Sequence, residues 1–325
     1  MTEPGIHPTA LPNDLPPDRL RHRPDERGDV AVDPATAGWR YLSFRAMRLA
    51  DGDAIEIGSP DRETAVVNLF GGDLRVDVGD AADGAVAGRG PSGSGFESAV
   101  LAGRATVFDG LPSAFYLPSG RTASAIATGR GVAAATMLAI ATAPTRPEIS
   151  AGLSPVLIRP DDVRVEVRGA GHSTREIHHI VAPDFPADRL LLVEVLTPAG
   201  NWSSWPPHKH DTDDMPDEAV LEEVYHYRFR RREAWALQRI YRAEGSPLGA
   251  PRDAVWAVRD GDVTVVTDGY HPFSATDADD AYYLNALAGD RRTMACSFDP
   301  ALDHVRSRWA SEPVDPRLPM VGRAG

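Results

Sequence analysis

Short apolar segments separated by polar breaks recur along most of this chain. Segments such as TAVVNLF (64–70), VRVEVRG (163–169) and RLLLVEVL (189–196) are rich in β-branched residues and are bounded by Gly, Pro, Asp or Ser. They recur about every 8–12 residues, a spacing that is typical of β-sandwiches and barrels. The pattern therefore predicts an all-β protein.

Two segments could depart from this pattern. Residues 300–310 (PALDHVRSRWA) are the best helix candidate, whereas the alanine-rich residues 131–143 fit either a helix or a strand. The latter segment is the longest apolar stretch, and it is shorter than the roughly 18 residues that a membrane-spanning helix needs. We therefore expect a protein that does not bind a membrane.

Composition divides the chain into two halves between two tails. Residues 1–35 are rich in Pro, Asp and Arg and lack periodicity, so we expect a disordered tail. The turn-rich sequence near residue 180 predicts an N-terminal domain over 36–180 and a C-terminal domain over 181–312, with a second tail over 313–325. Both halves combine strands with acidic and glycine-rich turns, which suggests a duplicated barrel.

The charge of the chain excludes several classes of partner. A net charge of −13 and a pI near 5.2 disfavour binding to nucleic acids or to anionic lipids. The single cysteine, Cys296, cannot form an intramolecular disulfide. The N-terminus has no apolar segment of the kind found in signal peptides, so we expect a cytoplasmic protein.

A pair of histidines suggests metal chemistry. The stretch NWSSWPPHKHD (201–211) places His208 and His210 two residues apart. On an extended strand, both side chains face the same side and can bind one metal ion. Such a pair alone is more often found on the surface or in a turn, so the prediction depends on further ligands.

Two later motifs supply those ligands. LEEVYHYRF (221–229) places Glu222 and Glu223 on opposite faces of a strand, and VVTDGYHP (265–272) places His271 after a strand and a glycine turn. Three imidazoles and a carboxylate suit Zn, Fe, Mn, Ni or Co. We predict one divalent metal per chain, with these ligands: His208, His210, Glu223 and His271. Glu222 is the alternative to Glu223 as the carboxylate ligand.

These motifs resemble those of a known enzyme family. NWSSWPPHKHD, LEEVYHYRF, DGYHP and YYLNALAG resemble sequences of the 5-deoxy-glucuronate isomerases of inositol catabolism, and the resemblance extends over residues 38–300. It implies two cupin barrels, with one metal site in the C-terminal barrel. Similarity to the related 5-keto-4-deoxyuronate isomerases favours Glu223 over Glu222 as the carboxylate ligand. Zinc is the metal expected first, with manganese or iron as alternatives.

The family implies an aldose–ketose isomerisation of a small sugar acid. 5-Deoxy-glucuronate would become 2-deoxy-5-keto-gluconate through an enediol, and a base would move the proton. The candidates for this base are Glu223, Glu222, His226 and a tyrosine. The candidates for binding the substrate are Lys209, Arg239, Arg175, Gln238 and Tyr282.

Two other functions fit the same residues. The first is a cupin dioxygenase that uses Fe(II) with the same ligands. The second is a non-enzymatic cupin that binds sugars. Exposed faces of the barrels are also compatible with a homo-oligomer.

Overall fold

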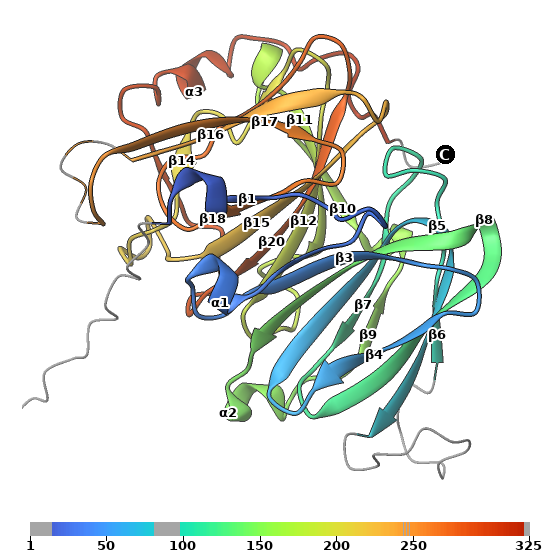
Figure 1. Ribbon diagram of the computed structural model, residues 1–325. Coiled ribbons are helices and arrows are strands. Elements are labelled where there is room, and N and C mark those ends of the chain that lie inside the picture. Colours follow the sequence, from blue (N-terminus) through green and yellow to red (C-terminus); the bar gives the residue numbers. More distant parts are fainter. Residues whose placement is uncertain (1–14, 81–97, 243, 245, 247, 322–325) are drawn as a thin grey trace, which may run out of the picture.

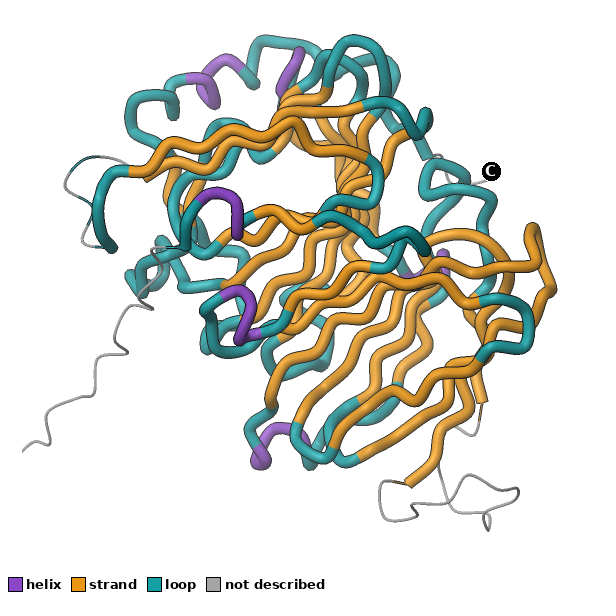
Figure 2. The backbone as a smooth tube through the Cα atoms, in the orientation of Figure 1, coloured by secondary structure: helices purple, strands orange, loops and turns teal. Residues whose placement is uncertain are grey.

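The computed structural model describes residues 15–80, 98–242, 244, 246 and 248–321, and strands dominate it. Figure 1 shows two barrels side by side, one drawn mostly in blue and green and the other mostly in yellow to red. Figure 2 shows that the helical segments are short and lie outside the sheets. The predicted all-β fold is therefore confirmed.

The N-terminal barrel is one sheet with the strand order β2-β3-β8-β5-β7-β9, in which β4 also pairs with β8 and β6 with β5. Its strands are β2 Val30–Val32, β3 Ser43–Leu49, β4 Ala54–Ser59, β5 Arg62–Asp80, β6 Ser98–Leu101, β7 Ser113–Leu117, β8 Arg121–Pro144 and β9 Val156–Ile158.

The C-terminal barrel contains a seven-stranded sheet in the order β1-β18-β15-β20-β12-β11-β10 and a four-stranded sheet in the order β13-β19-β16-β17, and β14 pairs with β21. Its strands are β1 Arg21–His22, β10 Arg164–Arg168, β11 Arg175–Val181, β12 Leu190–Thr197, β13 Trp202–Ser203, β14 His208–Lys209, β15 Glu222–Phe229, β16 Trp235–Arg242, β17 Arg252–Arg259, β18 Val263–Val266, β19 Phe273–Ala275, β20 Ala281–Ala288 and β21 Ser297–Phe298.

The helical segments are single turns; four of them connect strands, η1 precedes β1 and α3 follows β21. The α-helices are α1 Pro34–Ala37, α2 Pro147–Ser150 and α3 Val305–Arg308, and the 3-10 turns are η1 Pro17–Arg19, η2 Pro160–Asp162 and η3 Gly171–Ser173. The helix expected over 300–310 is thus reduced to α3. No helix in the described part of the chain is long and apolar enough to span a membrane.

The ambiguous segment 131–143 is part of strand β8. β8 pairs with β5 over nearly its whole length and also with β3 and β4. The β-branched residues Val132, Thr136, Ile140 and Thr142 favour the extended backbone, and the ladders to β3 and β5 satisfy most backbone polar groups of this segment. The strand pairing therefore outweighs the helix propensity of alanine.

The expected domain boundary at residue 180 is corrected by the pairing of the strands. β10 pairs with β11, and β11 pairs with β12, so 164–181 belong to the C-terminal sheet. The chain passes between the barrels after β9, around residues 159–163. The acidic and Pro-rich turn near 180, which suggested the boundary, instead connects two neighbouring strands of one sheet.

Both expected tails are also corrected where the structure describes them. β1 pairs with β18 of the C-terminal barrel, and β2 pairs with β3 of the N-terminal barrel, so 21–32 link the two barrels. Near the C-terminus, the Met320 N–H donates to the buried Glu176 carboxylate. Residues 1–14 and 322–325 lie outside the described residues. The low hydrophobicity of the two expected tails suggested disorder. They are ordered where the structure describes them, because their backbone N–H and C=O groups form hydrogen bonds with strands far away in the sequence.

Apolar residues form a core inside each barrel and a third between them. Leu74, Phe115 and Leu138 belong to the core of the N-terminal barrel. Tyr227 and Phe273 belong to the core of the C-terminal barrel. The third cluster packs outer faces of the two barrels against each other and includes residues from both halves, among them Phe44 and Val224.

Candidate metal centre

Four predicted ligands meet inside the C-terminal barrel. His208 lies in β14, opposite Phe298 of β21, and His210 follows that strand directly. Glu223 lies in β15 between β18 and β20. His271 lies in the segment between β18 and β19. The barrel thus brings together residues from three separate motifs of the sequence.

The turn before His271 depends on a glycine. Gly269 has φ of +81°, a conformation that other residues rarely adopt, and a Cβ there would lie 2.5 Å from the Tyr241 carbonyl oxygen. The Gly269 carbonyl in turn accepts a hydrogen bond from Nδ1 of His271 at 2.9 Å. The glycine therefore lets the backbone reach the position that orients the ligand.

The donor atoms lie within reach of a single ion. The ligand atoms of His208, His210 and His271 all lie within 4.8 Å of one another. Oε2 of Glu223 lies 2.9 Å from Nε2 of His210 and 3.3 Å from Nε2 of His271. Three nitrogens and one carboxylate oxygen therefore converge on one point, as in the N/O donor sets of transition-metal sites.

Backbone carbonyls set the orientation of two of the imidazoles. Nδ1 of His210 lies 2.9 Å from the Leu221 carbonyl oxygen, as Nδ1 of His271 does from that of Gly269. When Nδ1–H donates to a carbonyl, Nε2 presents its lone pair to the site, which is the usual arrangement of metal-binding histidines. Nε2 of His271 is buried and lies 3.3 Å from Oε2 of Glu223. The site therefore fits a divalent metal.

The electrostatics favour the metal-binding protonation states of His208 and Glu223, whereas burial of His210 is outweighed by its hydrogen bond to Glu223, which raises the pKa of His210. Burial lowers the pKa of His208 well below its usual value, and positive charge on His271 and His210 lowers it further. Burial alone would raise the pKa of Glu223, but hydrogen bonds from His210 and His271 outweigh it and leave that pKa below its usual value. A neutral imidazole and an ionised carboxylate are the forms that coordinate metal.

Glu222 points away from this cluster. Its carboxylate accepts backbone N–H groups of residues 40–42 in the N-terminal half, at 2.5, 2.8 and 2.8 Å. Burial raises its pKa, while these hydrogen bonds oppose the rise. Alternation along β15 thus separates the two neighbouring glutamates: Glu223 faces the histidines and Glu222 joins the barrels.

His226 also lies outside the cluster. It is fully buried beside Phe44, with ring centroids 5.7 Å apart, and neither ring nitrogen has a hydrogen-bond partner among the described residues. Burial lowers its pKa to about 3, so it is neutral in the fold. It therefore packs between the barrels, as Glu222 does.

The three candidate cations occupy different environments. Nζ of Lys209 binds Asp211 and Glu218 at 2.6 and 2.8 Å on the opposite side of β14 from the histidines. The Arg239 guanidinium forms an exposed ion pair with Asp253 at 2.8 Å. Both are thus engaged with carboxylates outside the cluster.

Arg175, in contrast, lies inside the barrel. It is 6% exposed, and Nη1 donates to the carbonyl oxygens of Ser173 and Trp205 at 3.0 and 3.1 Å. Burial lowers its pKa to about 10, and its charge helps to lower the pKa of His208. It forms no ion pair with a carboxylate among the described residues. Arg175 is therefore a buried cation whose charge acts on His208 and is not paired with a carboxylate among the described residues.

The polar groups of Gln238 and Tyr282 are hydrogen-bonded to other residues and are not directed at the histidine cluster. Nε2 of Gln238 donates to the carbonyl oxygens of His271 and Pro272 at 3.0 and 3.2 Å, and its Oε1 accepts from Tyr227. The Tyr282 hydroxyl donates to Glu194 at 2.7 Å. Gln238 therefore supports the backbone of His271, whereas Tyr282 serves a polar network between the barrels.

Tyr225 lies beside the histidines and contacts two further residues, Ser204 and Tyr283. The Tyr225 hydroxyl is 2.8 Å from Oγ of Ser204, and its ring lies 6.0 Å from that of His271. Tyr283 lies 4.7 Å from Tyr225, between ring centroids. Alternation along the strand places Tyr225 on the face of Glu223, as expected from the sequence, and Tyr225 is the tyrosine of β15 nearest the histidines. No sequence signal marks Ser204, whose φ of 48° is unusual for a residue other than glycine.

Known proteins share both the sequence and the fold. The model of the KduI/IolB family matches residues 18–305. The 5-deoxy-glucuronate isomerase of Geobacillus kaustophilus is 35% identical over 297 residues, which cover 87% of this chain and 93% of that protein. The enzyme of the same name from Geobacillus thermodenitrificans is 36% identical and covers 90% of this chain.

Solved structures show the same fold. The crystal structure of an IolB-like protein from Salmonella typhimurium has a TM-score of 0.74 and 32% identity, and the match covers 88% of this chain and 98% of that one. The oxalate decarboxylase of Lactobacillus farciminis has a TM-score of 0.56 at 12% identity, so it shares the double-barrel fold alone. With its family match and its relatives above 30% identity, the chain belongs to the KduI/IolB family.

Proposed function

We propose that this protein is a metal-dependent isomerase that converts 5-deoxy-glucuronate to 2-deoxy-5-keto-gluconate. Relatives that carry the name 5-deoxy-glucuronate isomerase support the reaction. The observation that carries the proposal is the cluster of His208, His210, Glu223 and His271 in the C-terminal barrel, with Arg175 beside it.

The four-residue cluster holds one divalent metal, and we propose zinc. Imidazole nitrogens with one carboxylate are common zinc ligands, although manganese and iron accept the same set. When bound, such a metal supplies Lewis-acid chemistry that polarises the substrate carbonyl and lowers the energy of the enediolate. Elemental analysis of protein purified without added metal identifies the native ion.

Arg175 binds the carboxylate of the substrate. A guanidinium makes two parallel hydrogen bonds to a carboxylate, and burial strengthens such a pair. Arg175→Ala should therefore raise KM by roughly 30-fold or more, with metal content unchanged. An unchanged KM in a folded Arg175→Ala variant would transfer this role to another cation.

Proton transfer then falls to groups inside the barrel. Glu222 and His226 face the other barrel, which leaves Glu223 as the candidate base. Burial and the charge of Glu223 raise the pKa of Tyr225 well above its usual value, so its protonated hydroxyl is a candidate proton donor. Isomerisation needs a proton to leave one carbon and return to its neighbour, so one group that reaches both carbons suffices. Tyr225→Phe keeps the ring and removes the hydroxyl. A turnover loss of about 100-fold or more in that variant, with metal content unchanged, would assign proton donation to Tyr225.

The reaction is tested directly with 5-deoxy-glucuronate. We expect NMR spectroscopy to show a ketone product with the metal-loaded protein and none after chelation. Conversion should be equal with and without oxygen, since isomerisation consumes none. Lack of conversion by the folded, metal-loaded protein would contradict the proposal, and oxygen uptake would instead support a dioxygenase.

A further inference from the structure

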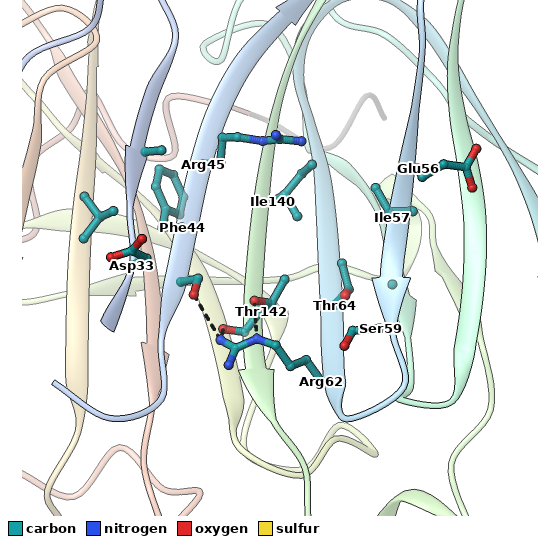
Figure 3. A pocket seen from close by; sticks show the side chains of 14 residues that line it. Asp33, Phe44, Arg45, Glu56, Ile57, Ser59, Arg62, Thr64, Ile140 and Thr142 are labelled. Carbon is teal, nitrogen blue, oxygen red and sulfur yellow. Dashed lines mark hydrogen bonds between the residues drawn. The ribbon is translucent and has the colours of Figure 1, made fainter. Parts of the chain in front are cut away.

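The N-terminal barrel contains a pocket of its own, remote from the histidine cluster. It has a volume of about 340 Å³ and is lined by side chains of strands β2, β3, β4, β5 and β8. Ile57 and Ile140 form part of its wall and also belong to the core of that barrel. Figure 3 shows charged and hydroxyl side chains around it. No residue of the candidate metal centre takes part.

A buried hydroxyl in this pocket has no partner. Thr64 is 1% exposed, it lines the pocket, and its Oγ1 forms no hydrogen bond with any described residue. A buried hydroxyl without a partner costs about 1–3 kcal/mol, so most such groups in proteins are paired. An atom that enters the pocket and hydrogen-bonds to Thr64 would remove that cost.

Charged groups of both signs lie around the same pocket. Arg45 and Glu56 also line the pocket and are exposed, and neither side chain forms an ion pair or hydrogen bond with another described residue. Arg62 has its Nε and Nη2 bound to hydroxyl and carbonyl oxygens, with Nε 3.0 Å from the Thr142 hydroxyl, and this fixes the guanidinium in place. Asp33 is already engaged, since it caps α1 through the Thr36 N–H.

The unmatched groups define the chemistry of a ligand. Arg45 would bind an anionic group of a ligand, and Glu56 would accept a hydrogen bond from it. The Thr64 hydroxyl can either donate or accept a hydrogen bond. A hydroxylated carboxylate carries both functions in one small molecule. We propose that this pocket is a second binding site, which takes a small sugar acid or hydroxy acid without chemical conversion.

Calorimetric titration of the metal-depleted protein with sodium D-glucuronate tests the site. We expect binding that persists in Arg175→Ala, because that variant weakens only the metal-centre barrel. Arg45→Gln should weaken this remaining binding by about tenfold or more. Thr64→Val should weaken it by about threefold or more, and it should fold normally because the hydroxyl makes no hydrogen bond in the free protein. Isomerase turnover should be unchanged in both N-terminal variants.

Four results would overturn the proposal. The first three are absence of D-glucuronate binding to Arg175→Ala, unchanged binding in folded Arg45→Gln and Thr64→Val, and equal binding of D-glucose, which lacks the carboxylate. Tighter binding of inorganic phosphate than of D-glucuronate would also contradict it, since it would indicate a plain anion site. Turnover of 5-deoxy-glucuronate by the holoenzyme is measured separately, so failure of this inference is distinguishable from failure of the proposed function.

Discussion

The two barrels share an architecture but differ in what their interiors hold. The N-terminal barrel is filled by aliphatic residues and Phe115, whereas the C-terminal barrel holds tyrosines, Arg175 and the histidine cluster. The sequence contains no histidine between residues 23 and 171, so the N-terminal barrel cannot repeat the three-histidine site. The comparison teaches that the fold offers a position for a metal, and that a few side chains decide whether it is used.

Buried glutamates also differ in their roles. Glu223 faces the histidine cluster, whereas Glu63, Glu194 and Glu222 serve contacts between the halves, and Glu194 also binds His178 at 3.1 Å. Glu63 accepts backbone N–H groups of residues 188–190, and Glu194 pairs with Arg104. A buried carboxylate therefore marks a candidate metal site only when other ligands face it.

The largest expected effect belongs to Glu223→Gln. A neutral amide is a poor metal ligand, and loss of a direct ligand should exceed the roughly 10–100-fold effects of outer hydrogen-bond partners. We expect isomerase activity to fall by more than about 100-fold. Metal per chain, measured by mass spectrometry, should fall with it.

The matched control lies in the other barrel. Glu56→Gln changes an exposed carboxylate of the N-terminal barrel and should leave both metal content and activity unchanged. Full metal content in Glu223→Gln would contradict the view that the C-terminal barrel binds the metal through Glu223.

Arg104→Met should be the most destabilising change between the barrels. Arg104 and Glu194 are both buried, and Nη1 of Arg104 lies 3.2 Å from Oε2 of Glu194. Removing one partner of such a pair costs about 3–5 kcal/mol, because the other charge stays buried. Urea denaturation measures the free energy of unfolding, and retained metal content would show that the site itself is intact. A loss below about 1 kcal/mol would contradict this role.

Glu222→Gln should have a smaller effect of the same kind. The amide keeps one acceptor oxygen, but it loses the charge that strengthens hydrogen bonds to residues 40–42. Hydrogen bonds to charged groups contribute about 1.5–3 kcal/mol, so we expect a loss within that range. Metal content should stay full. Loss of the metal instead would show that Glu222 is the ligand and that the face assignment is wrong.

The smallest effect is expected for Arg239→Ala. Its ion pair with Asp253 is exposed, with 42% and 58% of the two side chains accessible. Exposed pairs contribute about 0–1 kcal/mol, and Arg239 faces away from the histidines. Neither the thermal midpoint nor KM should change measurably. A raised KM would transfer substrate binding from Arg175 to Arg239.

Local sequence patterns predicted much of the fold. Alternation of apolar and polar residues predicted an all-β chain, and the order of His208, His210, Glu223 and His271 predicted a cluster that the barrel brings together. Period two along β15 also separates Glu223 from Glu222 correctly. The facing of Lys209, opposite to His208 and His210, follows from the same rule.

Long-range pairing explains what the sequence could not predict. β1 pairs with a strand more than 200 residues away, so nothing in its local composition distinguishes it from a tail. The boundary after β9 depends on which strand pairs with β10. Arg175 and Gln238 could not be placed, because the orientation of a side chain depends on the register of its strand within the sheet.

The most direct test is anomalous diffraction from crystals of the metal-loaded protein. The account predicts one strong peak per chain, surrounded by His208, His210, Glu223 and His271, and none inside the N-terminal barrel. A peak coordinated by Glu222, a peak within the N-terminal barrel, or no peak in metal-loaded active protein would contradict it.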